Sequence, residues 1–154
     1  MASGVGRFEA WAEGSRADLD LRRFPQGTRT AEDAAAAIGC EVGQIVKSLV
    51  FTVGGQPVVA LVSGANRLDQ RALSAAAGGP VGRADAALVR EATGYSIGGV
   101  PPFGHDRELP VYCDRDLLQY ASVWAAGGRP DTVFEITPGR LVELSRATVA
   151  DLRS

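Results

Sequence analysis

Apolar residues recur at helical spacing in several stretches of the chain, and capping residues mark where those stretches begin and end. Val5, Phe8 and Trp11 lie three residues apart, which predicts a helix near the N-terminus. Thr30 followed by Asp33 is a capping-box pattern and predicts the start of an alanine-rich helix. That helix is expected to end at Gly39, and three more are predicted, from Asn66 or Asp69 to Ala77, from Asp85 to Gly94, and from Thr137-Pro138 onward.

Two longer stretches are typical of β-strands. From Ile45 to Val53 most residues are β-branched or aromatic, Gly54-Gly55 supplies a turn, and Pro57 to Ser63 repeats the apolar composition, which predicts a hairpin. Shorter extended segments are predicted from Leu19 to Phe24-Pro25, ending at Gln26-Gly27, and at Val81 to Ala84, Pro110 to Cys113, Ser122 to Ala125, Thr132 to Ile136 and Ala147 to Ala150.

Helices alternate with strands early in the chain, whereas strands cluster late. Neither a repeated strand–helix–strand unit nor a simple antiparallel meander fits this order. We therefore predict an α+β protein, a single domain over residues 1–154 with a mixed sheet and helices packed around it. A chain of 154 residues can bury a core of its own without disulfides or metals.

Composition narrows the possible functions. Hydrophobic residues make up 45% and charged residues 22%, as in ordinary globular proteins, and the net charge of −2 excludes a broad basic face for long nucleic acids. No apolar run approaches the ~20 residues of a membrane span, and the N-terminus lacks a signal-peptide pattern, so we expect a cytoplasmic protein with no membrane contact. Cys40 and Cys113 have no metal-binding or redox spacing, and His105 is the only histidine, so no metal or other cofactor is predicted.

Lys47 is the first candidate for chemistry. The chain has fifteen arginines and this one lysine, which lies inside its clearest apolar stretch. A compact ammonium on a flexible stem cannot be exchanged for the planar arginine fork in a small pocket. Strand alternation places Lys47 on one face with Leu49, Phe51 and Val53, so its charge must meet a pocket mouth, a carboxylate or a ligand oxygen. The alternative is a lysine that extends to solvent at the edge of the sheet.

The segment from Tyr95 to Gly104 contains three glycines and two prolines and is predicted to be a shaped loop. Within it, Gly98-Gly-Val-Pro-Pro102 could present backbone amides to a carbonyl oxygen that gains charge during a reaction, although an ordinary surface turn has the same pattern. His105 after the loop has no carboxylate at a fixed spacing and is expected to be structural. Gly127-Gly128-Arg129-Pro130 is expected to connect two strands as a hairpin turn and could line the same pocket.

Three segments in order resemble the YbaK/EbsC family: Ile45-Val-Lys-Ser-Leu-Val-Phe51, Thr93-Gly-Tyr-Ser-Ile-Gly-Gly-Val-Pro-Pro-Phe-Gly104 and Trp124-Ala-Ala-Gly-Gly128. This family includes stand-alone YbaK and ProXp aminoacyl-tRNA deacylases and resembles the insertion domain of bacterial prolyl-tRNA synthetases. The resemblance spans about Leu19 to Leu152. With the strand pattern, it implies a mostly antiparallel sheet of six to seven strands, twisted or barrel-like, with surrounding helices.

The resemblance implies an enzyme that hydrolyses the ester between a wrong amino acid and transfer RNA, often proline transfer RNA carrying alanine, cysteine or serine. Its partners would be the 3′ end of the aminoacyl-tRNA and a prolyl-tRNA synthetase; nothing in the sequence indicates the oligomeric state. Lys47 aligns with the essential lysine of the family, and the GxxxP loop falls on Gly98 to Pro102. The implied catalytic residues are Lys47, Gly98 and Gly99, and the implied substrate-binding residues are Ser48, Val100, Pro101, Pro102, Ala126 and Gly127.

Two points leave the substrate and the activity open. The residue after the lysine varies with substrate in this family and is Ser48 here. In the later segment, YbaK-like members tend to carry serine where this chain has Ala126, which weakens the case for YbaK-type cysteine specificity. A non-catalytic module that binds an aminoacyl or nucleotide ligand is the main alternative to an editing enzyme. An enzyme that forms a Schiff base through Lys47 is the other alternative, and it would need a lowered lysine pKa.

Overall fold

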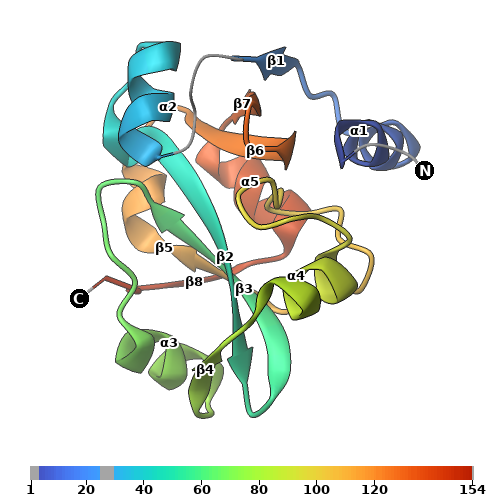
Figure 1. The fold of residues 1–154 in the computed structure, drawn as a ribbon. Helices are drawn as coiled ribbons and strands as arrows, with labels where there is room; N and C mark the ends of the chain where they lie inside the picture. Colours follow the sequence, from blue (N-terminus) through green and yellow to red (C-terminus); the bar gives the residue numbers. More distant parts are fainter. Residues whose placement is uncertain (1–3, 25–29, 154) are drawn as a thin grey trace.

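The computed structural model describes residues 4–24 and 30–153, which form one curled sheet with helices on its outside (Figure 1). The helices are α1 (Gly4–Gly14), α2 (Ala31–Ile38), α3 (Gln70–Ala77), α4 (Ala86–Thr93) and α5 (Pro138–Ser145), with short 3-10 turns η1 (Val42–Gln44) and η2 (Arg115–Gln119). The strands are β1 (Leu21–Arg23), β2 (Ile45–Val53), β3 (Gln56–Ser63), β4 (Val81–Arg83), β5 (Val111–Asp114), β6 (Val123–Arg129), β7 (Thr132–Ile136) and β8 (Thr148–Ala150).

The sheet is mixed, and its strands follow the order β1-β7-β6-β2-β3-β5-β8. Antiparallel pairs join β1 to β7, β6 to β7 and β2 to β3, whereas β2–β6, β3–β5 and β5–β8 are parallel. The eighth strand, β4, lies off this path and pairs antiparallel with the far end of β2. The predicted α+β class and the mixed, twisted or barrel-like sheet of six to seven strands are confirmed, with seven strands on the main path and β4 in addition.

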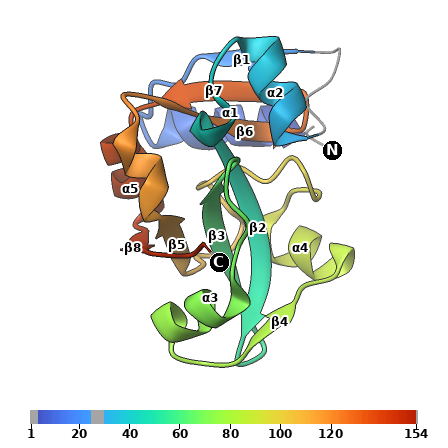
Figure 2. The same ribbon diagram turned by 90° about the vertical axis from the view of Figure 1, so that its left-hand side faces the viewer.

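The curl divides the molecule into two ends. Strands β1, β7 and β6 lie at one end with α1 and α2, while the long β2–β3 hairpin runs from them to the other end, where α3, α4 and β4 lie (Figures 1 and 2). The largest core cluster lies inside the curl and includes the fully buried Phe8, Val59, Leu61 and Phe134. Strand β2 thus pairs with β6 at one end of the molecule and with β4 at the other.

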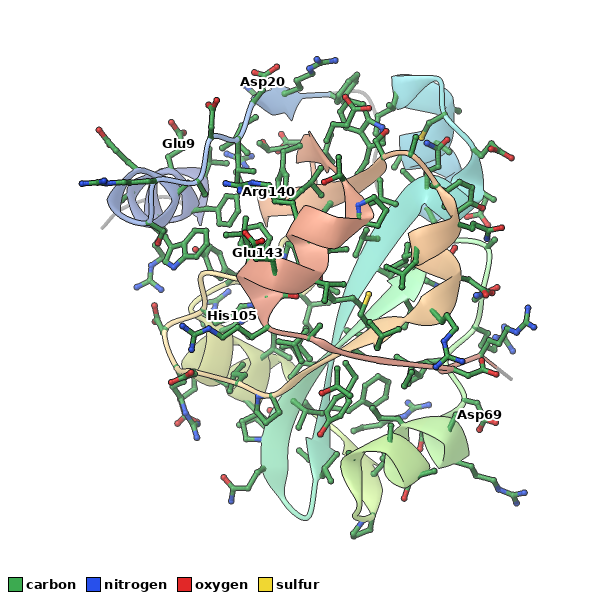
Figure 3. The ribbon with its side chains drawn as sticks, turned by 180° about the vertical axis from the view of Figure 1, so that it is seen from behind. Glu9, Asp20, Asp69, His105, Arg140 and Glu143 are labelled. Carbon is green, nitrogen blue, oxygen red and sulfur yellow. The ribbon has the colours of Figure 1, made fainter. Side chains whose placement is uncertain are left out.

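The predicted helix starts are confirmed by side-chain caps. Thr30 Oγ1 accepts a hydrogen bond from the Asp33 amide, and the Asp85 carboxylate accepts one from the Leu88 amide. Of the two candidates for α3, Asp69 is the cap, because its carboxylate accepts from the Arg71 amide (Figure 3). Asn66 is therefore not the cap of this helix.

Helix α5 covers the side of the sheet seen in Figure 3. Arg140 and Glu143 lie on its outer face with their charged groups 3.7 Å apart, while Leu141 is fully buried beneath them. The helix starts at Thr137, whose hydroxyl accepts from the Arg140 amide, and Pro138 occupies the first turn as the sequence predicts.

The predicted hairpin connection between two strands is confirmed for β6 and β7, but its turn lies further along the chain than predicted. Gly127 and Gly128 continue β6, which extends to Arg129 with an irregular register against β7, and the chain turns at residues 130–131 instead. Gly128 has a φ of +104°, and a Cβ there would lie 2.2 Å from the Gly4 carbonyl oxygen. Glycine is required here because the start of α1 packs directly on the strand, which no local pattern reveals. The predicted Pro25 and Gln26-Gly27 segment lies outside the described residues.

Candidate active site

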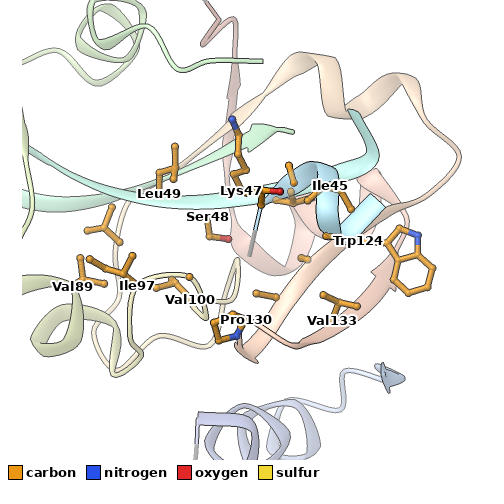
Figure 4. A pocket seen from close by; sticks show the side chains of 18 of the residues that line it. Ile45, Lys47, Ser48, Leu49, Val89, Ile97, Val100, Trp124, Pro130 and Val133 are labelled. Carbon is orange, nitrogen blue, oxygen red and sulfur yellow. The ribbon is translucent and has the colours of Figure 1, made fainter. Parts of the chain in front are cut away.

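A cavity of about 410 Å³ opens at the edge of β2 (Figure 4). On this edge β2 pairs with β6 only at Ile45 and Val46, and with β4 only at Phe51 to Val53. The edge between these two pairings is therefore free of a neighbouring strand, and the cavity lies against it. Its walls come from α2, β2, α4, the loop after α4 and β6–β7, and they are mostly apolar, including Val46, Val50, Val89, Val100, Trp124 and Val133.

Alternation along β2 sends Lys47 and Ser48 to opposite faces of the strand. Lys47 faces Val62 of β3 and shares its face with Leu49 and Phe51, as the sequence predicts. Figure 4 shows the Lys47 nitrogen on one side of the strand and the Ser48 hydroxyl on the other, directed toward Val100. The structure thus places the hydroxyl on the cavity side of β2 and the ammonium on the opposite side of the same strand.

The Lys47 ammonium is held by a backbone carbonyl. Its Nζ donates a hydrogen bond of 2.5 Å to the Asn66 oxygen, in a partly buried position. Burial lowers the pKa of Lys47, while the nearby carboxylates of Glu32 and Asp114 act to raise it and Arg67 acts to lower it. The net direction is downward, so the group gives up its proton more readily than an exposed lysine.

Asn66 is itself fixed by two acidic side chains. Its Nδ2 donates to Asp114 Oδ2 at 2.9 Å and to Asp116 Oδ2 at 2.8 Å. Asp114 is buried, and its carboxylate also accepts from the backbone amides of Ser63 and Asp116. Lys47 therefore rests on a carbonyl whose residue is anchored to a rigid carboxylate in the protein interior.

Inside the cavity, Ser48 Oγ is buried and has no hydrogen-bond partner among the described residues. A buried hydroxyl without a partner costs free energy, on the order of 1–3 kcal/mol. Such a group facing a cavity is available to a polar atom of a ligand.

The glycine-rich loop forms the wall opposite β2. Gly98 and Val100 line the cavity, and Gly98 adopts a φ of +89°, which favours glycine. The Gly99 amide donates to the Ser96 carbonyl oxygen at 3.0 Å, so it closes the turn and does not face the cavity. A Cβ on Gly99 would lie 2.9 Å from the Arg129 Cα, which shows how closely the loop packs on the end of β6.

The prolines and the histidine shape this loop from behind. Pro101 and Pro102 are buried and do not line the cavity. His105 Nε2 donates to the Pro101 carbonyl oxygen at 2.7 Å, and burial lowers the pKa of His105. The histidine thus contacts the loop backbone, as expected for a structural residue.

In the second glycine-rich segment, Ala126 lines the cavity and Gly127 does not. A Cβ on Gly127 would lie 2.8 Å from Leu21 Cδ2, on the side of β6 that faces β1. Of the nine residues predicted for the site, the structure brings five to the cavity: Lys47, Ser48, Gly98, Val100 and Ala126. Gly99, Pro101, Pro102 and Gly127 support its walls.

Comparison with known proteins agrees with the geometry. The family model described as an aminoacyl-tRNA editing domain matches residues 25–144, which include β2, the glycine-rich loop and β6. The chain belongs to the aminoacyl-tRNA editing domain family. It is 32% identical over 126 residues to EbsC of Enterococcus faecalis, named as a candidate Cys-tRNA(Pro)/Cys-tRNA(Cys) deacylase, covering 80% of this chain and 76% of that one.

Two further relatives show the domain in different settings. A proline–tRNA ligase of Maridesulfovibrio salexigens is 33% identical over 129 residues, covering 82% of this chain and 22% of the ligase. A crystal structure of a candidate trans-editing enzyme for prolyl tRNA synthetase superposes with a TM-score of 0.93 at 47% identity, covering 100% of this chain and 99% of that chain. The editing domain thus occurs both inside a synthetase and as a chain of this length.

For an editing domain, the arrangement offers charge and shape rather than a proton-transferring group. Within residues 4–24 and 30–153 no cluster of acidic, histidine and cysteine side chains could hold a metal ion. The polar side chains that line the cavity are those of Thr30, Lys47 and Ser48.

Sequence reasoning missed Asn66 and Asp114. Asn66 carried a helix-cap signal that Asp69 fulfils instead, and Asp114 ends a short strand without any motif. The polar residue that ends Val111-Tyr-Cys-Asp114 was the available signal, since a carboxylate after a buried strand needs partners.

Proposed function

We propose that the protein hydrolyses the ester bond of a mischarged aminoacyl-tRNA as a free-standing editing enzyme. The observation that carries this proposal is a mostly apolar cavity at the free edge of β2, with the single lysine on that strand, in a chain of the editing family. The aminoacyl group enters the cavity, and the nucleotide end stays outside at the rim.

Lys47 binds the terminal ribose and its phosphate. The ammonium lies on the face of β2 away from the glycine-rich loop, so it meets the part of the substrate that remains at the mouth. On the other rim, Ile97 has 62% of its surface exposed and offers an apolar contact.

The Gly98 amide donates to the ester carbonyl oxygen, and the Gly99 amide fixes the turn through Ser96. A water molecule attacks the carbonyl carbon, the bond to the ribose oxygen breaks, and that oxygen takes the proton. The products are the free amino acid and uncharged transfer RNA. A neighbouring ribose hydroxyl of the substrate can assist the proton transfer, so the protein needs no side-chain base.

The cavity selects a small amino acid. Ala126, Val100 and Val46 line it with apolar groups, while Ser48 Oγ provides one polar contact. Alanine, serine and cysteine fit this description, and proline transfer RNA is the carrier, since the matching domain also occurs in proline–tRNA ligases. A prolyl-tRNA synthetase is the candidate partner, and a substrate of this kind places the protein in the cytoplasm.

The test is turnover by the Lys47→Ala variant. Purified protein is incubated with alanyl-, cysteinyl- and seryl-tRNA(Pro), with prolyl-tRNA(Pro) as the correctly charged control. Wild-type protein is expected to release the small wrong amino acids and to spare proline. Lys47→Ala should lose deacylation by at least about 100-fold while its circular dichroism and melting temperature stay close to wild type, because the lysine is only partly buried.

The matched control is Arg67→Ala, which removes a nearby cation and leaves Lys47 in place. This variant is expected to keep most of the activity. Near-normal turnover by Lys47→Ala would refute the role of the lysine. Protection of the ester in place of cleavage by the wild-type protein would identify a binding module instead.

A further inference from the structure

The free edge of β2 presents unpaired backbone groups to the cavity. In an antiparallel ladder, alternate residues direct both their N–H and their C=O toward the same neighbour. The Gly64 amide, directly after β3, donates to the Ile45 carbonyl oxygen. Alternate residues of β2 therefore direct their backbone N–H and C=O groups toward the β3 side, namely Ile45, Lys47, Leu49 and Phe51. The residues between them direct theirs to the opposite edge.

Two independent contacts agree with this assignment. The Gly54 amide donates to the Pro80 carbonyl oxygen on the β4 side, which fixes the direction of Thr52 as well. Pro57, which has no N–H, lies opposite Thr52, where the β2–β3 ladder needs no donor. Val46 faces β6 and Thr52 faces β4, so Ser48 and Val50 face the gap between those two strands.

No strand partner reaches these two residues. Neither Ser48 nor Val50 pairs with β4 or β6, and no backbone hydrogen bond from the described loops ends on either of them. The surrounding wall is mostly apolar, and none of the described residues that line the cavity carries a carboxylate. Unpaired backbone groups beside an apolar cavity are costly unless a ligand or water binds them.

We propose that the free edge of β2 binds the α-ammonium group of the aminoacyl substrate through the Ser48 carbonyl oxygen, with the Ser48 amide next to the ester carbonyl. This rests on the function proposed above. An aminoacyl group is one residue of a polypeptide, so its nitrogen and its carbonyl have the spacing of a strand residue. It pairs with Ser48 as a single added residue of a neighbouring strand.

Position along the strand selects Ser48 over Val50. Lys47 immediately precedes Ser48, so an ester whose ribose is held at the rim places its acyl group beside residue 48. Among the groups that line the described cavity, the only acceptors for a cation are backbone carbonyls and the hydroxyls of Ser48 and Thr30. The edge therefore distinguishes an amino acid from a neutral acyl group of the same size.

The test compares alanyl-tRNA(Pro) with lactyl-tRNA(Pro), in which a hydroxyl replaces the ammonium and the rest of the acyl group is unchanged. Each kcat/KM is divided by the hydroxide-catalysed rate of the same ester, because the ammonium itself makes the ester more labile. A charged donor at a backbone acceptor predicts a normalised preference of about tenfold or more for the alanyl ester. Equal normalised rates would overturn the proposal.

A binding measurement separates this inference from the enzymatic function. Amide-linked analogues, 3′-alanylamino- and 3′-lactylamino-adenosine, cannot be cleaved at an ester, and their dissociation constants are measured by titration. Tighter binding of the alanyl analogue is expected whether or not the protein is an enzyme. Equal binding of the two would contradict the ammonium site even if esters are hydrolysed.

Ser48→Ala separates the backbone from the side chain. This variant removes the hydroxyl and leaves the N–H and C=O of residue 48 on the edge, so the alanyl-to-lactyl preference should persist. Loss of that preference in Ser48→Ala would assign it to the hydroxyl and overturn the role of the strand edge.

Discussion

At the scale of single residues, the position and the pKa of the Lys47 ammonium depend on groups that lie far away in the sequence. Asn66 supplies the oxygen that holds the ammonium, and Asp114 holds Asn66 from a buried position. Because Lys47 is the only lysine in the chain, any reagent selective for lysine ε-amines reports on this site alone. The electrostatics of the site can thus be measured directly.

We predict that Asp114→Asn lowers the pKa of Lys47 further, since it removes a carboxylate that favours the charged form. Reductive methylation with ¹³C gives one ε-dimethylamine signal, whose chemical shift is followed against pH by NMR. The same variant should destabilise the protein by about 1–3 kcal/mol in urea unfolding, because buried amides lose a charged acceptor.

The Arg67→Ala variant should shift the pKa of Lys47 in the opposite direction. Removing that cation should raise the pKa of Lys47, because a like charge no longer opposes protonation. If both substitutions moved the pKa in the same direction, or neither moved it, the electrostatic account of the site would be wrong.

The sequence revealed the parts of the site that carry local signals and missed those that depend on tertiary contacts. Lys47 stood out by composition, and Gly98 by the density of glycine and proline around it. The contacts from Asn66 to Asp114 and Asp116 span 48 and 50 residues along the chain. They exist because β3 and β5 are parallel neighbours, which no local pattern predicts.

At the scale of elements, the same distinction holds. Helix starts were predicted well because a cap is a contact over three or four residues, as at Thr30 and Asp85. The turn after β6 was misplaced because Gly128 is required by the packing of α1, 124 residues earlier. Long-range backbone contacts of this kind override local turn signals.

Helix α1 lies before the segment matched by the family model, yet it contacts both ends of the glycine-rich loop. Arg7 donates to the Gly94 carbonyl oxygen at 3.0 Å and pairs with Asp106 at 2.9 Å. Trp11 packs on the loop, 5.0 Å from the Phe103 ring centre, and leaves no room for a Cβ on Gly104. The helix thus braces the wall that carries Gly98.

We therefore predict that Trp11→Ala reduces kcat/KM for ester hydrolysis by about tenfold, since small displacements of positioning groups are costly in rate. It should also lower the free energy of unfolding by about 1–3 kcal/mol, less than for a fully buried aromatic. Steady-state kinetics below the melting transition separate the two effects.

Glu13→Ala on the same helix is the control for this prediction, because Glu13 is exposed and, among the described residues, no hydrogen bond joins it to the loop. It should leave both quantities within error of wild type. Unchanged kinetics in a folded Trp11→Ala variant would show that α1 contributes to stability alone.

At the scale of the whole molecule, charge limits how the protein can hold transfer RNA. The net charge is −2, and many arginines are already paired with acidic side chains, among them Arg7, Arg23, Arg129, Arg140 and Arg153. Such pairing leaves less unpaired positive charge for phosphates. On the proposed function, recognition then comes from the acylated end or from a partner protein.

We accordingly predict that uncharged transfer RNA binds weakly. Its affinity should fall as the salt concentration rises, but with a small slope because few phosphates are contacted. For about two to three phosphate contacts on a single strand, the slope of log K against log salt should be about −1.5 to −2. Removing Lys47 should reduce the magnitude of this slope by the contribution of about one phosphate contact. Arg140→Ala, on the outer face of α5, should leave it unchanged. Tight binding that persists at high salt, or a slope several times steeper, would show an extensive phosphate-binding surface and contradict a site that reads only the end of its substrate.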